Sequence, residues 1–221
     1  MKRIPFELSF LAYALLSVCL IFIVWAIGTS QIGLDGGFYL AITRNLWEDG
    51  INYFDFASSY NPLGILLLGI PNLFFENPVQ LNYILYFFIL ILDAVLFYKV
   101  CMLYRNNSIQ AIFFSSIFLL YALILDGHLI ILEPIQLFFI FLAFLQLHKK
   151  KLISLGVICF LAFLTKQYSL AFALPIVFFI FQSSESLLKK MTHLLLVVSS
   201  VVISAIIFYW LYAQHIDYSY Y

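Results

Sequence analysis

A few ionisable side chains border long apolar runs, and these are the residues with which the chain could do chemistry. Asp35 follows the first apolar run, Glu133 precedes a later one, and Lys166 separates two short ones. A carboxylate in a partly dry site can act as a general base, and an ammonium can neutralise charge that develops on a phosphate. Because an ionisable group beside apolar residues is costly to desolvate, all three are candidates for function.

Each of these residues has two interpretations. Asp35 precedes two glycines that allow a sharp turn near a substrate, but Asp is also a favoured N-cap for a following helix. Glu133 precedes Pro134, which suits a first helical turn, so Glu133 is either a cap or a partly buried acid. Lys166 needs an anionic partner, and an anionic ligand or an acidic side chain would both serve.

Other polar residues favour structural roles. Asp93 lies deep in an apolar run, where it would either hydrogen-bond Ser115 or Ser116 of a neighbouring helix or be protonated. His128 has no second histidine or cysteine nearby, and we therefore predict no metal site and no cofactor. The three cysteines are far apart and lie in apolar runs, which favours small core residues over disulfides.

The composition indicates a protein embedded in lipid. Hydrophobic residues make up 65% of the 221 residues and charged residues only 10%, whereas soluble domains carry roughly 25% charged residues. The net charge is zero, so no electrostatic argument favours a nucleic-acid partner. We expect an all-α, polytopic membrane protein that forms a single module over residues 1–221.

The apolar runs predict the membrane spans, because a span needs about 20 apolar residues. The candidate segments are 9–28, 79–104, 109–125, 129–147, 152–165, 168–182 and 191–213. One further apolar stretch, 60–75, is short and broken by glycines and a proline, so whether it crosses the membrane is ambiguous.

The positive-inside rule decides the ambiguous stretch. If residues 60–75 do not cross, nine of the eleven basic residues fall on one side, with only Arg44 and Lys166 on the other. If they cross, that count drops to three. We therefore predict seven spans in the cell membrane, with a cytoplasmic N-terminus and an extracytoplasmic C-terminus.

The loop from about residue 29 to 78 is the long extracytoplasmic one, and its many aromatic residues argue against disorder. We expect it to fold over the membrane surface with interfacial helices near 38–47 and 63–75. The spans on either side of Lys166 are short. They predict a hairpin whose tip stops below the outer surface, where the lysine faces a water-accessible cavity.

Six short motifs follow one another along the chain. They are Asp35-Gly36-Gly37-Phe38-Tyr39, Trp47-Glu48-Asp49-Gly50, Tyr53-Phe54-Asp55-Phe56, Tyr60-Asn61-Pro62-Leu63, Glu133-Pro134, and Gly156 through Leu164-Thr165-Lys166-Gln167. Their order resembles that of the GT-C glycosyltransferases, near the bacterial protein O-mannosyltransferase and aminoarabinose transferase branch, and the resemblance covers nearly the whole chain.

This resemblance implies transfer of a sugar from a polyprenyl-phosphate donor to an acceptor on the extracytoplasmic face. By analogy Asp35 is the catalytic carboxylate, and a cation at Lys166 or Arg44 offsets the charge of the leaving phosphate. The resemblance implies the following substrate-binding residues: Arg44, Tyr60, Asn61, Glu133, Lys166 and Gln167.

Two departures from the family pattern qualify that implication. Many relatives have a second acid beside the catalytic carboxylate, where this chain has Gly36 or Gly37, which argues against a divalent metal. Relatives also run to around twice this length, so we expect a minimal core, a truncated product, or a subunit that needs a partner. The rival functions are a transporter or flippase of a lipid-linked substrate, and a non-catalytic membrane subunit.

Overall fold

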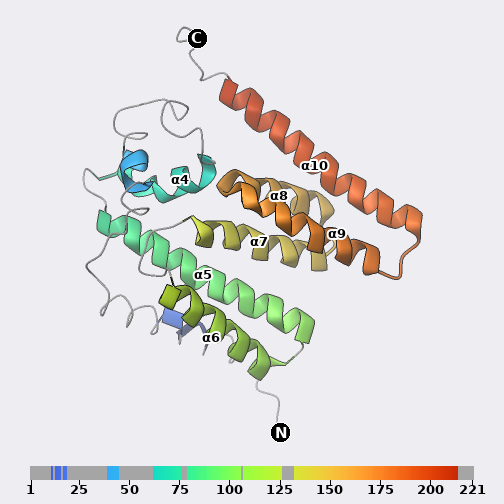
Figure 1. The fold of residues 1–221 in the computed structure, drawn as a ribbon, viewed down its shortest axis with the longest axis horizontal. Helices are drawn as coiled ribbons and strands as arrows, with labels where there is room; N and C mark the ends of the chain where they lie inside the picture. The colour runs from blue at the N-terminus through green and yellow to red at the C-terminus, as the bar shows by residue number, and fades with distance from the viewer. Residues whose placement is uncertain are drawn as a thin grey trace.

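The computed structural model describes residues 11, 13–15, 17–18, 39–44, 62–75, 79–105, 107–125 and 132–213. This described part is all-helical (Figure 1), and residues 39–44 form a short helical segment. The nine further helices within it are α4 (Pro62–Leu68), η1 (Ile70–Leu73), α5 (Val79–Arg105), α6 (Ser108–Leu125), α7 (Glu133–His148), α8 (Leu152–Thr165), η2 (Gln167–Phe172), α9 (Ala173–Gln182) and α10 (Leu187–Ala213).

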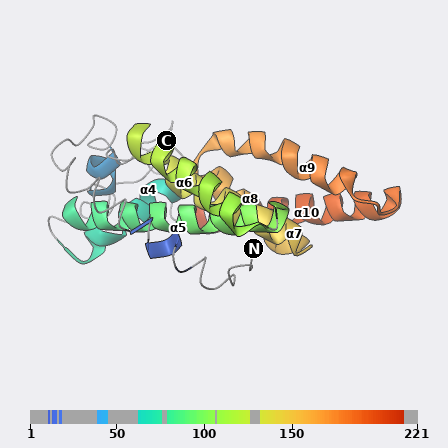
Figure 2. The same ribbon diagram turned by 90° about the horizontal axis from the view of Figure 1, so that it is seen from below.

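The helices from α5 to α10 run back and forth between two ends of a slab, which Figure 2 shows edge-on. One end holds α4, the starts of α5 and α7, and the end of α8; we call it the α4 end. The other holds the α7–α8 turn and the α9–α10 loop, and we call it the lysine end after Lys149, Lys150, Lys151, Lys189 and Lys190. Helix α8 packs against both α7 and α10, while α5 packs against α6 and α7.

Polar residues and proline mark where the helices begin and end. Asn107 caps α6, because its side-chain oxygen accepts the backbone N–H groups of Ile109 at 3.0 Å and Gln110 at 3.3 Å. Pro134 lies in the first turn of α7, where its missing N–H costs nothing. The α7–α8 turn places Lys150 in the left-handed region with φ 55°.

Two apolar cores hold the slab together. Around α5, Phe97 packs against Phe118 of α6 and Phe141 of α7, with ring centroids 5.0 and 5.1 Å apart. Tyr13 stacks on Tyr98 of α5 at 5.2 Å, so part of the N-terminal region packs there too. The second core joins α7 through α10 and includes Leu155, Ile176, Ile180 and Val197.

Two of the described helices, α5 and α10, are long and apolar enough to cross a membrane. Within the most apolar part of α10 only 11% of residues are buried, so its apolar side chains face outward, unlike those of a soluble core helix. The other apolar helices, α6 to α9, have between 10 and 18 residues. Seven spans therefore stay a prediction.

The expected helix positions agree with the described residues at most boundaries. Helix α5 matches the segment 79–104, α6 matches 109–125, and α8 matches 152–165. Helix α4 has seven residues and is about 10 Å long, far too short to cross a bilayer, as expected for the stretch 60–75. The first predicted span, 9–28, lies mostly outside the described residues.

Three helices begin elsewhere than expected. Helix α7 begins at Glu133 rather than at 129. Helix α9 is preceded by the 3-10 helix η2, because the chain is extended at Lys166 and winds tightly before it becomes α-helical. Helix α10 begins at Leu187, four residues before 191, because a helix can carry Lys189 and Lys190 beyond the apolar part that a span requires.

Candidate functional site

The ion pair between Lys166 and Glu133 is the centre of the candidate site, at the α4 end of the slab. Glu133 is the first residue of α7, and Lys166 is the C-cap of α8, where its backbone N–H bonds to Ala162 at 3.1 Å. An acid at a helix N-terminus and a cation at a C-terminus both interact favourably with the helix dipoles. The antiparallel packing of α7 and α8 therefore brings the two charges together.

Both charges remain accessible from outside the protein. The Lys166 side chain is 20% exposed and that of Glu133 is 45% exposed. A pair with this much water contact contributes little to stability, on the order of 1 kcal/mol or less. Of the two expected partners of Lys166, an acidic side chain is the one present among the described residues. The Glu133 carboxylate is exposed enough that another anion could replace it.

Uncharged polar side chains support this ion pair from within the protein. Gln136, one turn after Glu133, donates to the Ser169 hydroxyl at 2.7 Å. That hydroxyl lies 2.7 Å from the carbonyl of Ala162 and 2.8 Å from that of Lys166, and its single hydrogen can donate to either. Gln136 and Ser169 are buried. The network therefore fixes the extended backbone at Lys166 against α7.

An apolar cleft of about 400 Å³ begins directly beside this network, between α7, α8, α9 and α10. Ala162, Phe163, Ser169 and Leu170 line it, so residues on both sides of Lys166 in the chain contribute to its wall. No charged side chain lines it among the residues that the structure describes. Lys166 itself does not line the cleft, but its chain neighbours on both sides do, so the residue that carries the cation is close in the chain to a space suited to a hydrocarbon chain.

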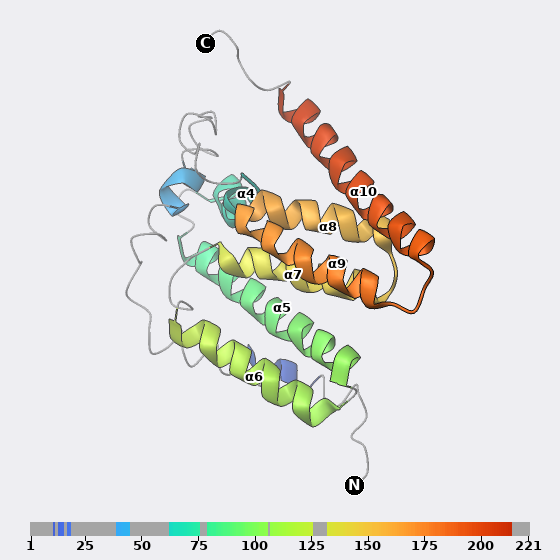
Figure 3. The same ribbon diagram turned by 45° about the vertical axis from the view of Figure 1, so that its right-hand side comes forward.

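Helix α4 packs against the end of α8 (Figure 3). A Cβ atom at Gly64 would lie 3.1 Å from both Leu132 and Thr165, which precede Glu133 and Lys166. Leu132 and Thr165 are fully buried as a result. The part of the long loop that contains α4 therefore packs on the protein at the candidate site, and its expected position in the membrane interface stays a prediction.

The other predicted site residues divide into two groups. Gln167 follows Lys166 at the start of η2 and is exposed, and Arg44 is exposed on the helical segment 39–44. Asp35, Tyr60 and Asn61 lie outside the described residues. The structure therefore brings together Glu133, Lys166 and Gln167.

A buried amide network anchors the segment that carries Arg44. The side-chain amide of Asn72 in η1 donates to the hydroxyl of Thr43 at 3.2 Å, and Asn82 of α5 donates to Asn72 at 3.5 Å. All three residues are buried. Since Thr43 directly precedes Arg44, this network ties the position of the Arg44 backbone to α5.

Of the two alternatives for Asp93, the hydrogen bond to a serine is wrong, and the protonated carboxyl stays a prediction. Asp93 is fully buried, but its carboxylate oxygens bond to neither Ser115 nor Ser116, and they have no hydrogen-bond partner among the described residues. The Ser115 hydroxyl donates instead to the backbone carbonyl of Ala111. A helical serine always has the carbonyl one turn back within reach, and here that local bond replaces the expected one.

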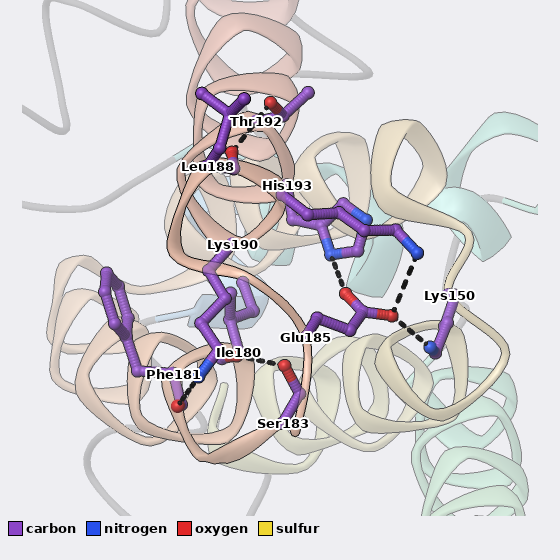
Figure 4. A network of polar contacts seen from close by, with 10 residues as sticks. Lys150, Ile180, Phe181, Ser183, Glu185, Leu188, Lys190, Thr192 and His193 are labelled. Atoms are coloured by element: carbon purple, nitrogen blue, oxygen red, sulfur yellow. Dashed lines mark hydrogen bonds and ion pairs between the residues drawn. The ribbon is translucent and has the colours of Figure 1, made fainter.

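The sequence analysis missed an ionic cluster at the lysine end (Figure 4). The Glu185 carboxylate lies 2.6 Å from Lys150, 3.5 Å from Lys189 and 3.2 Å from the ring of His193. The hydrogen bond from Lys150 holds the pKa of Glu185 below its usual value, and the charges around it act in the same direction. The signal was available, because Glu185 is the sole acid between Pro134 and Ala213.

Comparisons with protein-family models, with curated proteins and with solved structures give no match for this chain. Within the described residues there is also no group of three or more histidine, cysteine, aspartate or glutamate side chains arranged to hold a metal ion. The function therefore has to be inferred from the ion pair, the cleft beside it and the pattern of the sequence.

Proposed function

We propose that the chain is a membrane-embedded glycosyltransferase of the GT-C kind, which transfers a sugar from a polyprenyl-phosphate donor on the extracytoplasmic face. The observation that carries this proposal is the position of Lys166 beside the apolar cleft. A lipid-linked donor has a phosphate joined to a long hydrocarbon chain, and it needs a cation and an apolar surface side by side. Residues 162–170 include the cation of Lys166 and four residues that line the apolar cleft.

Membrane residence is part of this proposal. It is supported by the outward-facing apolar side chains of α10 and by the composition of the whole chain. Residues Lys149 to Lys151, Lys189 and Lys190 gather at one end of the slab, and Lys166 lies at the other. By the positive-inside rule the lysine end faces the cytoplasm, and the ion pair faces outward.

In the proposed reaction an acceptor hydroxyl attacks the anomeric carbon of the donor sugar. The bond from that carbon to the phosphate oxygen breaks, and the pair of electrons leaves with the polyprenyl phosphate. By the resemblance described above, Asp35 accepts the proton of the hydroxyl, a step typically worth about 10²–10⁴ in rate. Lys166 offsets the negative charge that grows on the leaving phosphate.

Donor binding in this scheme requires Lys166 to exchange the Glu133 carboxylate for the donor phosphate. The exchange is feasible because the pair is partly exposed and therefore weak. The two partners should then respond in opposite directions to substitution. Loss of the cation weakens donor binding. Glu133, which the resemblance assigns to substrate binding, competes in this scheme with the donor phosphate for Lys166, so its loss strengthens donor binding.

The binding test uses the purified chain in detergent, with thermal unfolding measured as a function of added polyprenyl phosphate. A ligand that binds only the folded state raises the unfolding temperature. We expect stabilisation of the wild type, less for Lys166→Gln, and more for Glu133→Gln at equal lipid concentration. Lys166→Arg is the matched control that keeps the charge. Equal stabilisation of all four proteins would show that Lys166 does not bind the phosphate.

The activity test measures release of polyprenyl phosphate from a radiolabelled polyprenyl-phosphate sugar. We expect Asp35→Asn to abolish release while donor binding persists, since the change removes the charge and keeps the size. Near-normal turnover of Asp35→Asn would refute the assignment of the base. Donor binding without any transfer by the wild type would favour a flippase, which reconstituted vesicles can test by movement of the labelled lipid between leaflets.

A further inference from the structure

The lysine end of the slab carries a second charged surface that plays no part in sugar transfer. Lys149, Lys150 and Lys151 form the turn between α7 and α8, and Lys189 and Lys190 lie in the first turn of α10. These two segments are far apart in the sequence. The Glu185 carboxylate links them, because it pairs with Lys150 at 2.6 Å and with Lys189 at 3.5 Å (Figure 4).

One carboxylate among five ammonium groups leaves an excess of four positive charges. Lys149 and Lys151 are exposed and form no ion pair with any described residue. Lys190 donates to the backbone carbonyl of Phe181 at 2.7 Å, which orders its side chain without neutralising it. Glu185 therefore gathers the lysines into one surface but compensates only a fraction of their charge.

Exposed apolar side chains directly border these charges. Leu187 is 67% exposed, Leu188 80% and Met191 50%, and all three lie within two residues of Lys189 or Lys190. The acidic surface of a soluble protein would pair with the lysines, but it would leave the exposed leucines in contact with water. A lipid molecule offers both a negative headgroup and hydrocarbon tails, so it complements the surface as a whole.

We propose that this lysine surface binds anionic glycerophospholipids, with their phosphodiester headgroups on the lysines and their tails against the first two turns of α10. The proposal uses the membrane embedding described above but not the sugar-transfer reaction. Its occupant is a lipid of the leaflet at the lysine end, which is the opposite end from Lys166. If the lysine surface proves not to bind lipid, the proposed donor site at Lys166 is unaffected, and failure of the donor site likewise leaves the lipid proposal intact.

The experiment titrates the intact chain in neutral detergent with short-chain phosphatidylglycerol, phosphatidylcholine, free glycerol phosphate or polyglutamate, and follows thermal unfolding. The test variant is the double substitution Lys149→Gln/Lys151→Gln, which removes two exposed charges and leaves the Glu185 ion pairs in place. The matched control, Lys149→Arg/Lys151→Arg, keeps both charges. A second readout is the salt dependence of the stabilisation, between about 0.05 and 0.5 M NaCl.

We expect phosphatidylglycerol to stabilise the wild type and the arginine variant far more than phosphatidylcholine does. The glutamine variant should bind phosphatidylglycerol at least about tenfold more weakly, since each lysine near an anionic surface contributes roughly a fivefold factor. High salt should reduce this difference. Equal stabilisation by both lipids, equal binding by the glutamine variant, or full reproduction of the effect by free glycerol phosphate would each overturn the proposal. Tighter binding of polyglutamate than of phosphatidylglycerol would also overturn it, in favour of an acidic protein partner.

Discussion

Gly156 holds α8 and α10 at close range, and its replacement by alanine gives the sharpest stability prediction. A Cβ atom at this position would overlap the Ser200 hydroxyl and lie 2.5 Å from the backbone carbonyl oxygen of Val197, whereas ordinary contacts begin at 3.4 Å. The serine can rotate away from the new methyl group. The backbone carbonyl cannot, so α10 would have to move away from α8 by nearly 1 Å.

The expected size of the effect combines two opposing contributions. Overpacking of this kind costs typically about 1–3 kcal/mol. Alanine is better than glycine in a helix by about 1 kcal/mol, which offsets part of that cost. The difference between the two is about 0–2 kcal/mol. Because the contact with the backbone carbonyl at 2.5 Å is severe, we expect Gly156→Ala to fall in the upper half of that range, a loss of about 1–2 kcal/mol in the free energy of unfolding. For a chain of this size that loss lowers Tm by roughly 2–8 °C.

The assay is thermal unfolding in detergent, with Gly64→Ala as the matched control. At Gly64 the new methyl would lie 3.1 Å from the ends of the Leu132 and Thr165 side chains, which can shift, so we expect little or no loss. Adding Ser200→Ala to Gly156→Ala should restore part of the stability, because it removes the overlapping hydroxyl but not the Val197 carbonyl. If Gly156→Ala proves as stable as the wild type, the close approach of α8 and α10 is wrong.

Two further predictions concern charge at the lysine end and the orientation of the slab. Because the folded-state pKa of Glu185 is lowered, its ion pairs stabilise the protein fully above the unfolded value of about 4.3, and that contribution is lost as pH falls through the folded value. The stability difference between wild type and Glu185→Gln, measured by thermal unfolding from neutral to acidic pH, should therefore shrink in acid, and a constant difference would contradict it. For orientation, single cysteines introduced at Lys150 and Gln167 in a cysteine-free background should react with an impermeant thiol reagent from opposite sides of intact cells, and reaction from one side would refute the proposed topology.

The helix positions could be predicted from the sequence because polar residues interrupt apolar runs at nearly every turn. Asn107 and the lysines at 149–151 separate helices in the structure where the hydropathy pattern changes. The start of α10 was less predictable, since the hydrophobic pattern locates the part of a helix that suits lipid and not its polar end. Lys189 and Lys190 are helical but lie outside the apolar run.

The candidate site was only partly predictable. Lys166 and Glu133 could be paired as one of two alternatives, because a lone cation beside apolar residues requires an anion. Gln136 and Ser169 could not, since uncharged polar residues occur throughout such helices and only the packing of α7 on η2 makes them partners. At Glu185 the sequence shows a lone acid with Lys189 four residues later, but the pairing with Lys150 of the distant α7–α8 turn is a tertiary contact that local sequence does not encode.

The close approach at Gly156 also has a consequence for the size of molecules that the cleft admits. Val197 belongs to the same helix face that touches Gly156, and it lines the cleft together with Val198, Val201 and Val202. The distance between α8 and α10 therefore sets the width of the cleft, and the volume of the side chain at position 156 sets that distance. Glycine gives the narrowest spacing that the backbone allows. We therefore expect this residue, which does not line the cleft itself, to act as a spacer between two of its walls: a larger side chain at position 156 should widen the cleft between α8 and α10 at the expense of stability.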